Sequence, residues 1–140
     1  MIPYKISNIV TKQFAIFPEK FVNGEIVNIN TNYNFNLKVD FSEIRCSSVI
    51  QFIQKEHLIL VLEVVCNFNI AAEGVDFIKN ENKIPVDFLR YMATIVVGTA
   101  RGIIHSKTEG SVLNSIVLPP INLVDTIQSD FQINEKSNCN

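Results

Sequence analysis

The chain of 140 residues is short enough for one domain and long enough to bury a single hydrophobic core. Its formal net charge of −2 argues against the strongly basic surface of a nucleic-acid-binding protein, and its Lys and Arg residues are scattered. Hydrophobic residues make up 47% of the chain, which indicates apolar surface that a partner or self-association covers.

The N-terminal residues lack the basic start and apolar run of a secretory signal, and no apolar segment is long enough to cross a membrane. The three cysteines, Cys46, Cys66 and Cys139, form no C-x-x-C pair and are expected to be free thiols in a reducing compartment. We therefore expect a cytoplasmic protein that does not insert into membranes.

Residues 4–17 are rich in Ile, Val, Phe and Thr and end at Pro18, so they predict a first strand. Their apolar residues change face along the segment, which a β-bulge would explain. The following loop contains Asn23-Gly24 and is too long for a two-residue hairpin.

Residues 27–41 carry the clearest pattern in the chain. Every odd position from Val27 to Phe41 is apolar except Thr31, and every even position is polar. This period of two predicts a long strand with one buried and one wetted face. At about 3.3 Å per residue the strand would be roughly 50 Å long, so we expect it to bend or to carry a bulge.

Two further strands are predicted over residues 44–54 and 58–70. In the second of these every even position is non-polar, and the odd positions begin with Ile59, Val61, Glu63 and Val65. A strand that is apolar on both faces either is covered twice or binds something with its second face.

After a polar stretch over residues 72–83, the hydrophobic period becomes helical. Pro85 suits a first helical turn, and Asp87 is favourable near the positive end of the helix dipole. Apolar residues then recur every three or four positions as far as Ile103. We expect this helix to cover the odd face of residues 27–41. Its Gly98-x-x-x-Gly102 motif predicts either close packing on the sheet or close approach to a helix of another subunit.

A loop containing Gly110, a short helix over residues 123–128 and a disordered tail over 129–140 complete the prediction. The expected fold is therefore α+β, in a single domain of residues 1–128. It has a four-stranded antiparallel sheet covered on one face by a long helix, with a short C-terminal helix.

The search for chemistry predicts no metal site, no cofactor and no enzyme. His57 and His105 lie outside any metal-ligand spacing and suit a solvated turn and a helix end. Cys46 and Cys66 fall on the apolar side of their strands, as core cysteines do. Glu63, among apolar odd positions, is either a polar member of a contact surface or a catalytic acid in a pocket.

Four short motifs then resemble one family, the SecB-like chaperones. They are Val10-Thr11-Lys12, Leu62-Glu63-Val64, Ile84-Pro85 and Leu118-Pro119-Pro120-Ile121-Asn122. The last resembles the proline-asparagine segment of the family, and the order and spacing of all four match over residues 4–127. The resemblance implies a SecB-like fold.

The resemblance also implies a function, namely holding unfolded polypeptides or preproteins in the cytoplasm without a cofactor. Such a chaperone would be a homotetramer, a dimer of dimers, that delivers its clients for protein export to the SecA translocase motor. Its apolar grooves or subunit interfaces would lie on the second face of the sheet. The candidate residues are Phe17, Val49, Ile53, Ile59, Val61 and Val65.

Glu63 matches the family and is a candidate partner contact, whereas Gln13 and Phe17 stand where export chaperones carry acidic residues. One alternative is therefore a SecB-like chaperone of a toxin–antitoxin system that is not coupled to SecA. A second alternative is a small-ligand-binding α+β domain with Glu63 in its pocket.

Overall fold

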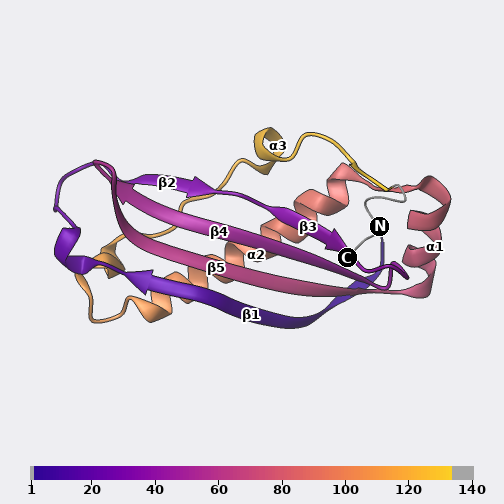
Figure 1. Ribbon diagram of the computed structural model, residues 1–140, viewed down its shortest axis with the longest axis horizontal. Helices are drawn as coiled ribbons and strands as arrows, with labels where there is room; N and C mark the ends of the chain where they lie inside the picture. The colour runs from indigo at the N-terminus through magenta and orange to yellow at the C-terminus, as the bar shows by residue number, and fades with distance from the viewer. Residues whose placement is uncertain (1, 134–140) are drawn as a thin grey trace.

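A computed structural model of the protein describes the structure of residues 2–133. Its main sheet is antiparallel and four strands wide, in the order β1-β5-β4-β2, with β3 also paired to β4 (Figure 1). The strands are β1 (Tyr4–Ile16), β2 (Asn28–Thr31), β3 (Asn34–Leu37), β4 (Glu43–Gln54) and β5 (His57–Ile70). The register of β1 on β5 shifts at two places, which confirms the bulged first strand.

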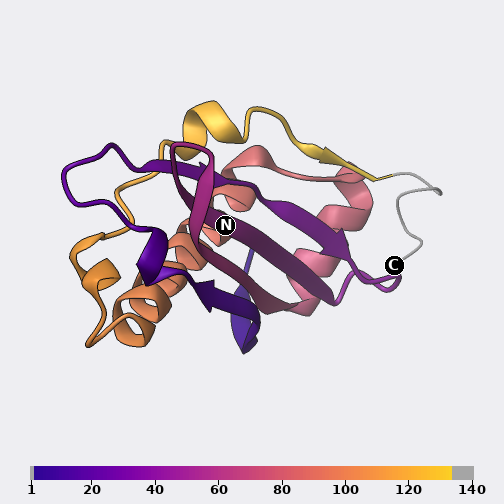
Figure 2. The same cartoon turned by 60° about the vertical axis from the view of Figure 1, so that its left-hand side comes forward.

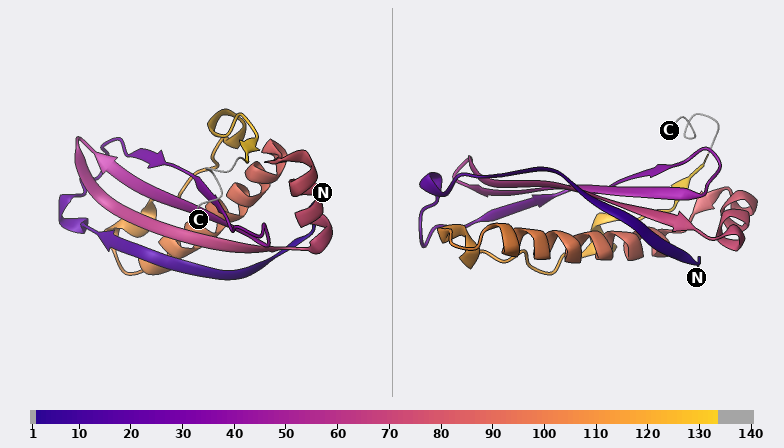
Figure 3. Two further views of the ribbon diagram at one scale, coloured as in Figure 1. Left: turned by 45° about the vertical axis from the view of Figure 1, so that its right-hand side comes forward. Right: turned by 90° about the horizontal axis from the view of Figure 1, so that it is seen from below.

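The long helix α2 (Val86–Lys107) lies along one face of the sheet and packs on the central strands β4 and β5 (Figure 3). Within residues 2–133, no helix covers the opposite face. The short helix α3 (Leu123–Thr126) follows, so the predicted α+β class, with a long helix on one face of an antiparallel sheet, is confirmed. No helix of the described residues is long and apolar enough to cross a bilayer.

The predicted long strand over residues 27–41 is two short strands, β2 and β3, which pair with successive parts of β4. Between them the amide side chain of Asn32 accepts a hydrogen bond from the Val49 backbone N–H at 3.0 Å. The expected bend is therefore a break in the strand. Leu37 is buried as predicted, but Val39 lies in an exposed turn that includes Phe41 at φ 65°.

The core lies between α2 and the facing side of the sheet. The even positions of β5 from Leu60 to Phe68 are all buried there, as their alternation predicts. From α2 the core receives residues spaced by three and four, such as Met92, Val96 and Ala100. The loop between β1 and β2 contains a 3₁₀ turn (Pro18–Lys20) and projects beyond one end of the sheet (Figure 2).

A helix that the sequence did not predict, α1 (Ala72–Glu81), occupies the polar stretch at the other end of the sheet. It begins close to the N-terminal segment, where the Ala71 N–H donates to the Pro3 carbonyl at 3.0 Å. Gly74 makes this approach possible, because a Cβ there would lie 2.6 Å from Ile2 Cγ2 and 2.8 Å from Ile70 Cγ2.

The predicted disordered tail is wrong for its first residues. Strand β7 (Phe131–Gln132) pairs with β6 (Lys83–Ile84), and Ile133 is buried. Asp130 holds this end in place, because its carboxylate accepts from the Val86 N–H at 2.7 Å and lies 3.1 Å from Lys83 Nζ. The rest of the predicted tail, residues 134–140, lies outside the described residues.

Candidate functional site

The six residues predicted to line a groove or a subunit interface do not form an open apolar groove. Phe17, Val49 and Ile53 are half-buried. Ile59 is fully buried, and Val61 and Val65 are only 6% and 3% exposed. The expectation that these three side chains are free to bind other chains is therefore wrong for the isolated subunit.

The position of β5 between β1 and β4 explains this burial. Val61 lies in register between Ala15 and Gln51, and Val65 lies between Val10 and Ser47. A short β-branched side chain on a central strand is hidden by neighbours on both sides, even where no second layer covers the face. Ile59, at a shift in the β4–β5 register, belongs to the buried hydrophobic core.

Glu63 is half-buried on the face of the sheet away from α2, in register between Gln13 and Val49. The residues around the larger cavities described below do not include it. Nor do the described residues contain a group of three or more His, Cys, Asp or Glu side chains that could hold a metal ion. Glu63 therefore lies on a surface where a partner can reach it, and the catalytic-pocket alternative gains no support.

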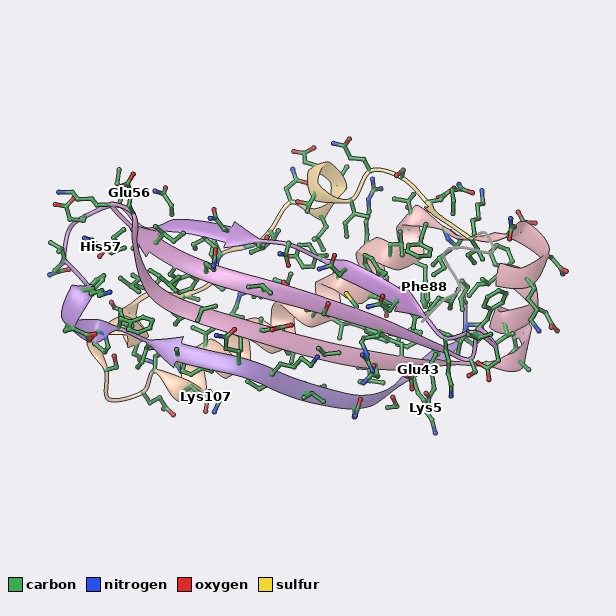
Figure 4. The ribbon with its side chains drawn as sticks, in the orientation of Figure 1. Lys5, Glu43, Glu56, His57, Phe88 and Lys107 are labelled. Atoms are coloured by element: carbon green, nitrogen blue, oxygen red, sulfur yellow. The ribbon has the colours of Figure 1, made fainter. Side chains whose placement is uncertain are left out.

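The histidines and the two described cysteines lie where the sequence predicts. His57 is exposed at the start of β5, directly after the turn (Figure 4), and His105 is exposed in the last turn of α2. Cys46 and Cys66 are buried directly opposite each other in the β4–β5 register. Burial raises the pKa of both thiols, so neither has the thiolate character of a nucleophile.

Three of the exposed apolar side chains lie together on β1, at the edge of the sheet. Ile6, Ile9 and Val10 are 42%, 49% and 39% exposed. Because β1 pairs with β5 on one side only, the backbone groups along its other side pair with no strand in the described structure. We call these three side chains and the free backbone beside them the β1 edge.

Aromatic contacts fix the position of α2 beside this strand. Tyr4 at the start of β1 packs edge-on against Tyr91, with ring centroids 5.6 Å apart, and Lys107 lies over Phe14 near the end of β1. The hydrogen bond between the Tyr4 and Tyr91 hydroxyls, together with burial, raises the pKa of Tyr4 to about 12. Side chains of α2 therefore contact β1 near both ends of the strand.

Gly98 and Gly102 lie on the solvent-facing side of α2. A Cβ at either position would meet nothing within 4 Å, so neither glycine is needed for packing on the sheet. The first of the two readings of this motif is therefore not supported. Tyr91 is also exposed, seven residues before Gly98, and we call these three residues the glycine side of α2.

A second apolar surface lies where the segment 117–123 crosses α2. A cavity of about 470 Å³ is lined there by Val97, Val117 and the Leu118-Pro119-Pro120-Ile121 motif. Arg101 holds the segment in place, because its guanidinium donates to the carbonyls of Leu118 at 2.6 Å and Pro119 at 2.9 Å. We call this hollow the proline groove.

Sequence reasoning did not select the exposed residues of β1 as candidates, although it noted their irregular pattern. The apolar side chains of residues 4–17 change face, and the pattern by itself indicates only a bulge. The same change of face puts Ile9 on the helix side and Val10 on the other side, so both sides of the edge are apolar.

Comparison with known proteins finds no matching family model and no matching curated protein. Among solved structures, the chain is similar to the Mycobacterium tuberculosis SecB-like chaperone Rv1957, solved in complex with a ChAD peptide from the HigA1 antitoxin. The identity is 11% and the TM-score 0.48, over 85% of this chain and 91% of the other. This likeness does not by itself assign the chain to that family.

Proposed function

We propose that the chain is a SecB-like chaperone, which binds apolar segments of unfolded polypeptides and acts as a homo-oligomer. The observation that carries this proposal is the β1 edge, where unpaired backbone lies between exposed Ile6, Ile9 and Val10. An extended polypeptide satisfies such an edge by adding a strand, and apolar burial adds affinity with little demand on sequence.

The size of the apolar contribution favours several edges acting together. Full burial of an aliphatic side chain is worth roughly 1.5 to 3 kcal/mol, and the three side chains are already about half buried. The β1 edge can therefore add only roughly 2 to 4 kcal/mol, which corresponds to millimolar binding at best. Linking several such edges in an oligomer raises the affinity for one long client without a new kind of contact.

A second copy of the chain can use the same kinds of surface. A helix of another subunit can approach the glycine side of α2 closely, because a side chain at Gly98 or Gly102 would meet no neighbour within the chain.

The proline groove is a further client site, since it is apolar and open. Its exposed Val117 would be covered by a bound segment.

The destination of the clients is a separate part of the proposal. Delivery to SecA would use Glu63, which lies beside Gln13 on the open face of the sheet. Service to a toxin–antitoxin pair would need no such contact. Pull-down of SecA and of an antitoxin by the wild-type protein and by the Glu63→Gln variant separates these two alternatives.

The test of the function is suppression of aggregation of an unfolded substrate without nucleotide. The wild-type protein should delay light scattering, and Ile9→Asp should weaken the effect because a charge at the β1 edge opposes apolar burial. Val39→Asp is the matched control, since Val39 is 66% exposed in a turn away from the edge. A wild-type protein that binds no unfolded chain would refute the proposal.

The test of assembly is the molar mass in solution by light scattering. Gly98→Leu should lower the mass if another helix packs there, whereas Asn80→Leu on exposed α1 should leave the mass unchanged. A wild-type monomer at high concentration would refute the homo-oligomer while leaving the chaperone activity to the aggregation assay.

A further inference from the structure

A cavity of about 620 Å³ lies at the end of the molecule that carries α1, away from the proline groove. Its walls come from the N-terminal segment, α1 and the start of α2. Phe88, which lines it, lies beside α1 in Figure 4. The volume is within the range of small-molecule sites, which are mostly apolar with a few polar groups.

The lining of this cavity has two chemical parts. Apolar and aromatic residues make most of the wall, and two carboxylates, Glu73 and Asp87, complete it on the solvent side, where the Asp87 side chain is 95% exposed. The full set is Ile2, Pro3, Glu73, Gly74, Phe77, Pro85, Asp87 and Phe88. No Lys, Arg or His is among these lining residues.

The two carboxylates are little used by the protein. Asp87 has one weak ion pair, with Arg90 Nη1 at 3.7 Å, and the Arg90 Nε donates instead to the Ile127 carbonyl. Glu73 has no ion-pair partner within residues 2–133. Both residues also lie in the first turn of a helix, where a carboxylate stabilises the helix by interacting with its dipole, without any ligand.

The aromatic rings favour the same ligand charge as the carboxylates. Phe77 is an exposed side chain on the wall, and Phe88 is buried beside it in the lining. The face of an aromatic ring attracts a cation, so the two rings and the two carboxylates together favour a positive group attached to an apolar body. The close fit of Gly74 against Ile2 holds the N-terminal wall in position.

We propose that this cavity is a binding site for a small organic cation with an apolar body, such as a hydrophobic primary amine. The site is independent of the β1 edge and does not depend on the chaperone function. Its apolar walls would enclose the body of the ligand, and its ammonium group would lie at the carboxylates of Glu73 and Asp87.

The test uses three probes with one apolar body and different head groups: 4-phenylbutylamine, 4-phenylbutanol and 4-phenylbutanoate. Binding to the full chain is followed by NMR shifts of the Ile2 methyl groups. At low salt the amine should bind about three- to tenfold more tightly than the alcohol, as two solvent-exposed charge pairs allow. The butanoate should bind most weakly, and 0.5 M salt should reduce the differences.

The variant Glu73→Gln/Asp87→Asn should remove the preference for the amine and keep the binding of the alcohol. If the carboxylates only stabilise the two helices through their dipoles, this variant should change thermal stability and leave the order of the three binding affinities unchanged. Phe77→Ala should weaken all three probes, and Lys79→Ala on the same helix is its control. Equal binding of the three probes by the wild type, binding of none, or binding only of a peptide carrying Phe-Lys would overturn the proposal.

Discussion

The most direct test of the fold is Gly74→Ala, because the structure gives the substitution two opposing effects of known sign. Alanine is more favourable than glycine in a helix by up to about 1 kcal/mol, and by less in the first turn. The added Cβ, however, would lie 2.6 Å from Ile2 Cγ2 and 2.8 Å from Ile70 Cγ2, both too close for carbon atoms. Forcing an extra methyl group into a packed site costs typically 1–3 kcal/mol.

The net expectation is a loss of about 1–2 kcal/mol, or a fall in Tm of about 3–8 °C for a domain of this size. Urea unfolding followed by circular dichroism measures it, with an unchanged m-value showing that only stability has changed. Asn80→Ala, at an exposed site of α1, should be neutral or slightly stabilising.

A double-mutant cycle tests the cause of the effect. If Ile2 Cγ2 is the group that the new Cβ meets, Gly74→Ala should cost less in an Ile2→Ala background. A Gly74→Ala variant as stable as the wild type would refute the close approach of α1 to the N-terminal segment.

Three further outcomes follow from buried or paired polar groups. Ser48→Ala should raise the free energy of unfolding by about 0.5–1 kcal/mol, because the Ser48 hydroxyl is buried without a hydrogen-bond partner in the described structure; a loss would contradict this. Gln54→Leu should speed amide exchange in the loop before β2, because Gln54 bonds both backbone groups of Val22 at 2.9 Å; unchanged protection would show that the loop is held otherwise. Asp130→Asn should destabilise at neutral pH, since the Val86 N–H and Lys83 lower the pKa of Asp130 below its usual 3.8. That contribution is present above the unfolded pKa and is lost as pH falls through the lowered value, so unfolding curves of wild type and variant should converge in acid.

Sequence periodicity predicted which side chains face the core, but not where a strand stops. The alternation over residues 27–41 put Leu37 on the buried side correctly. The alternation contains no information about whether the strand is continuous. At the break, the Asn32 side chain accepts the hydrogen bond of the Val49 N–H in place of a backbone carbonyl. Helix α1 was missed because its apolar residues, such as Val75 and Ile78, are few and Gly74 weakens the helical pattern.

The exposure of the second face could not be predicted from one strand alone. Val61 and Val65 have the same alternation that an exposed apolar row would have, and they are hidden only because β1 and β4 flank them. Ile6 and Ile9 are exposed for the converse reason, since β1 has a neighbour on one side only. Strand order, which depends on contacts distant in sequence, therefore decides which apolar residues can meet another chain.

The break between β2 and β3 also makes the two borders of the sheet unequal. One border is a single 13-residue strand, whereas the other consists of two four-residue strands separated by Asn32 and Tyr33. Stacking of sheets into an open-ended fibril needs two compatible borders on every molecule. Each molecule has only one long border. When two molecules join through these borders, no long border remains for a third molecule, so growth by this route ends at a pair.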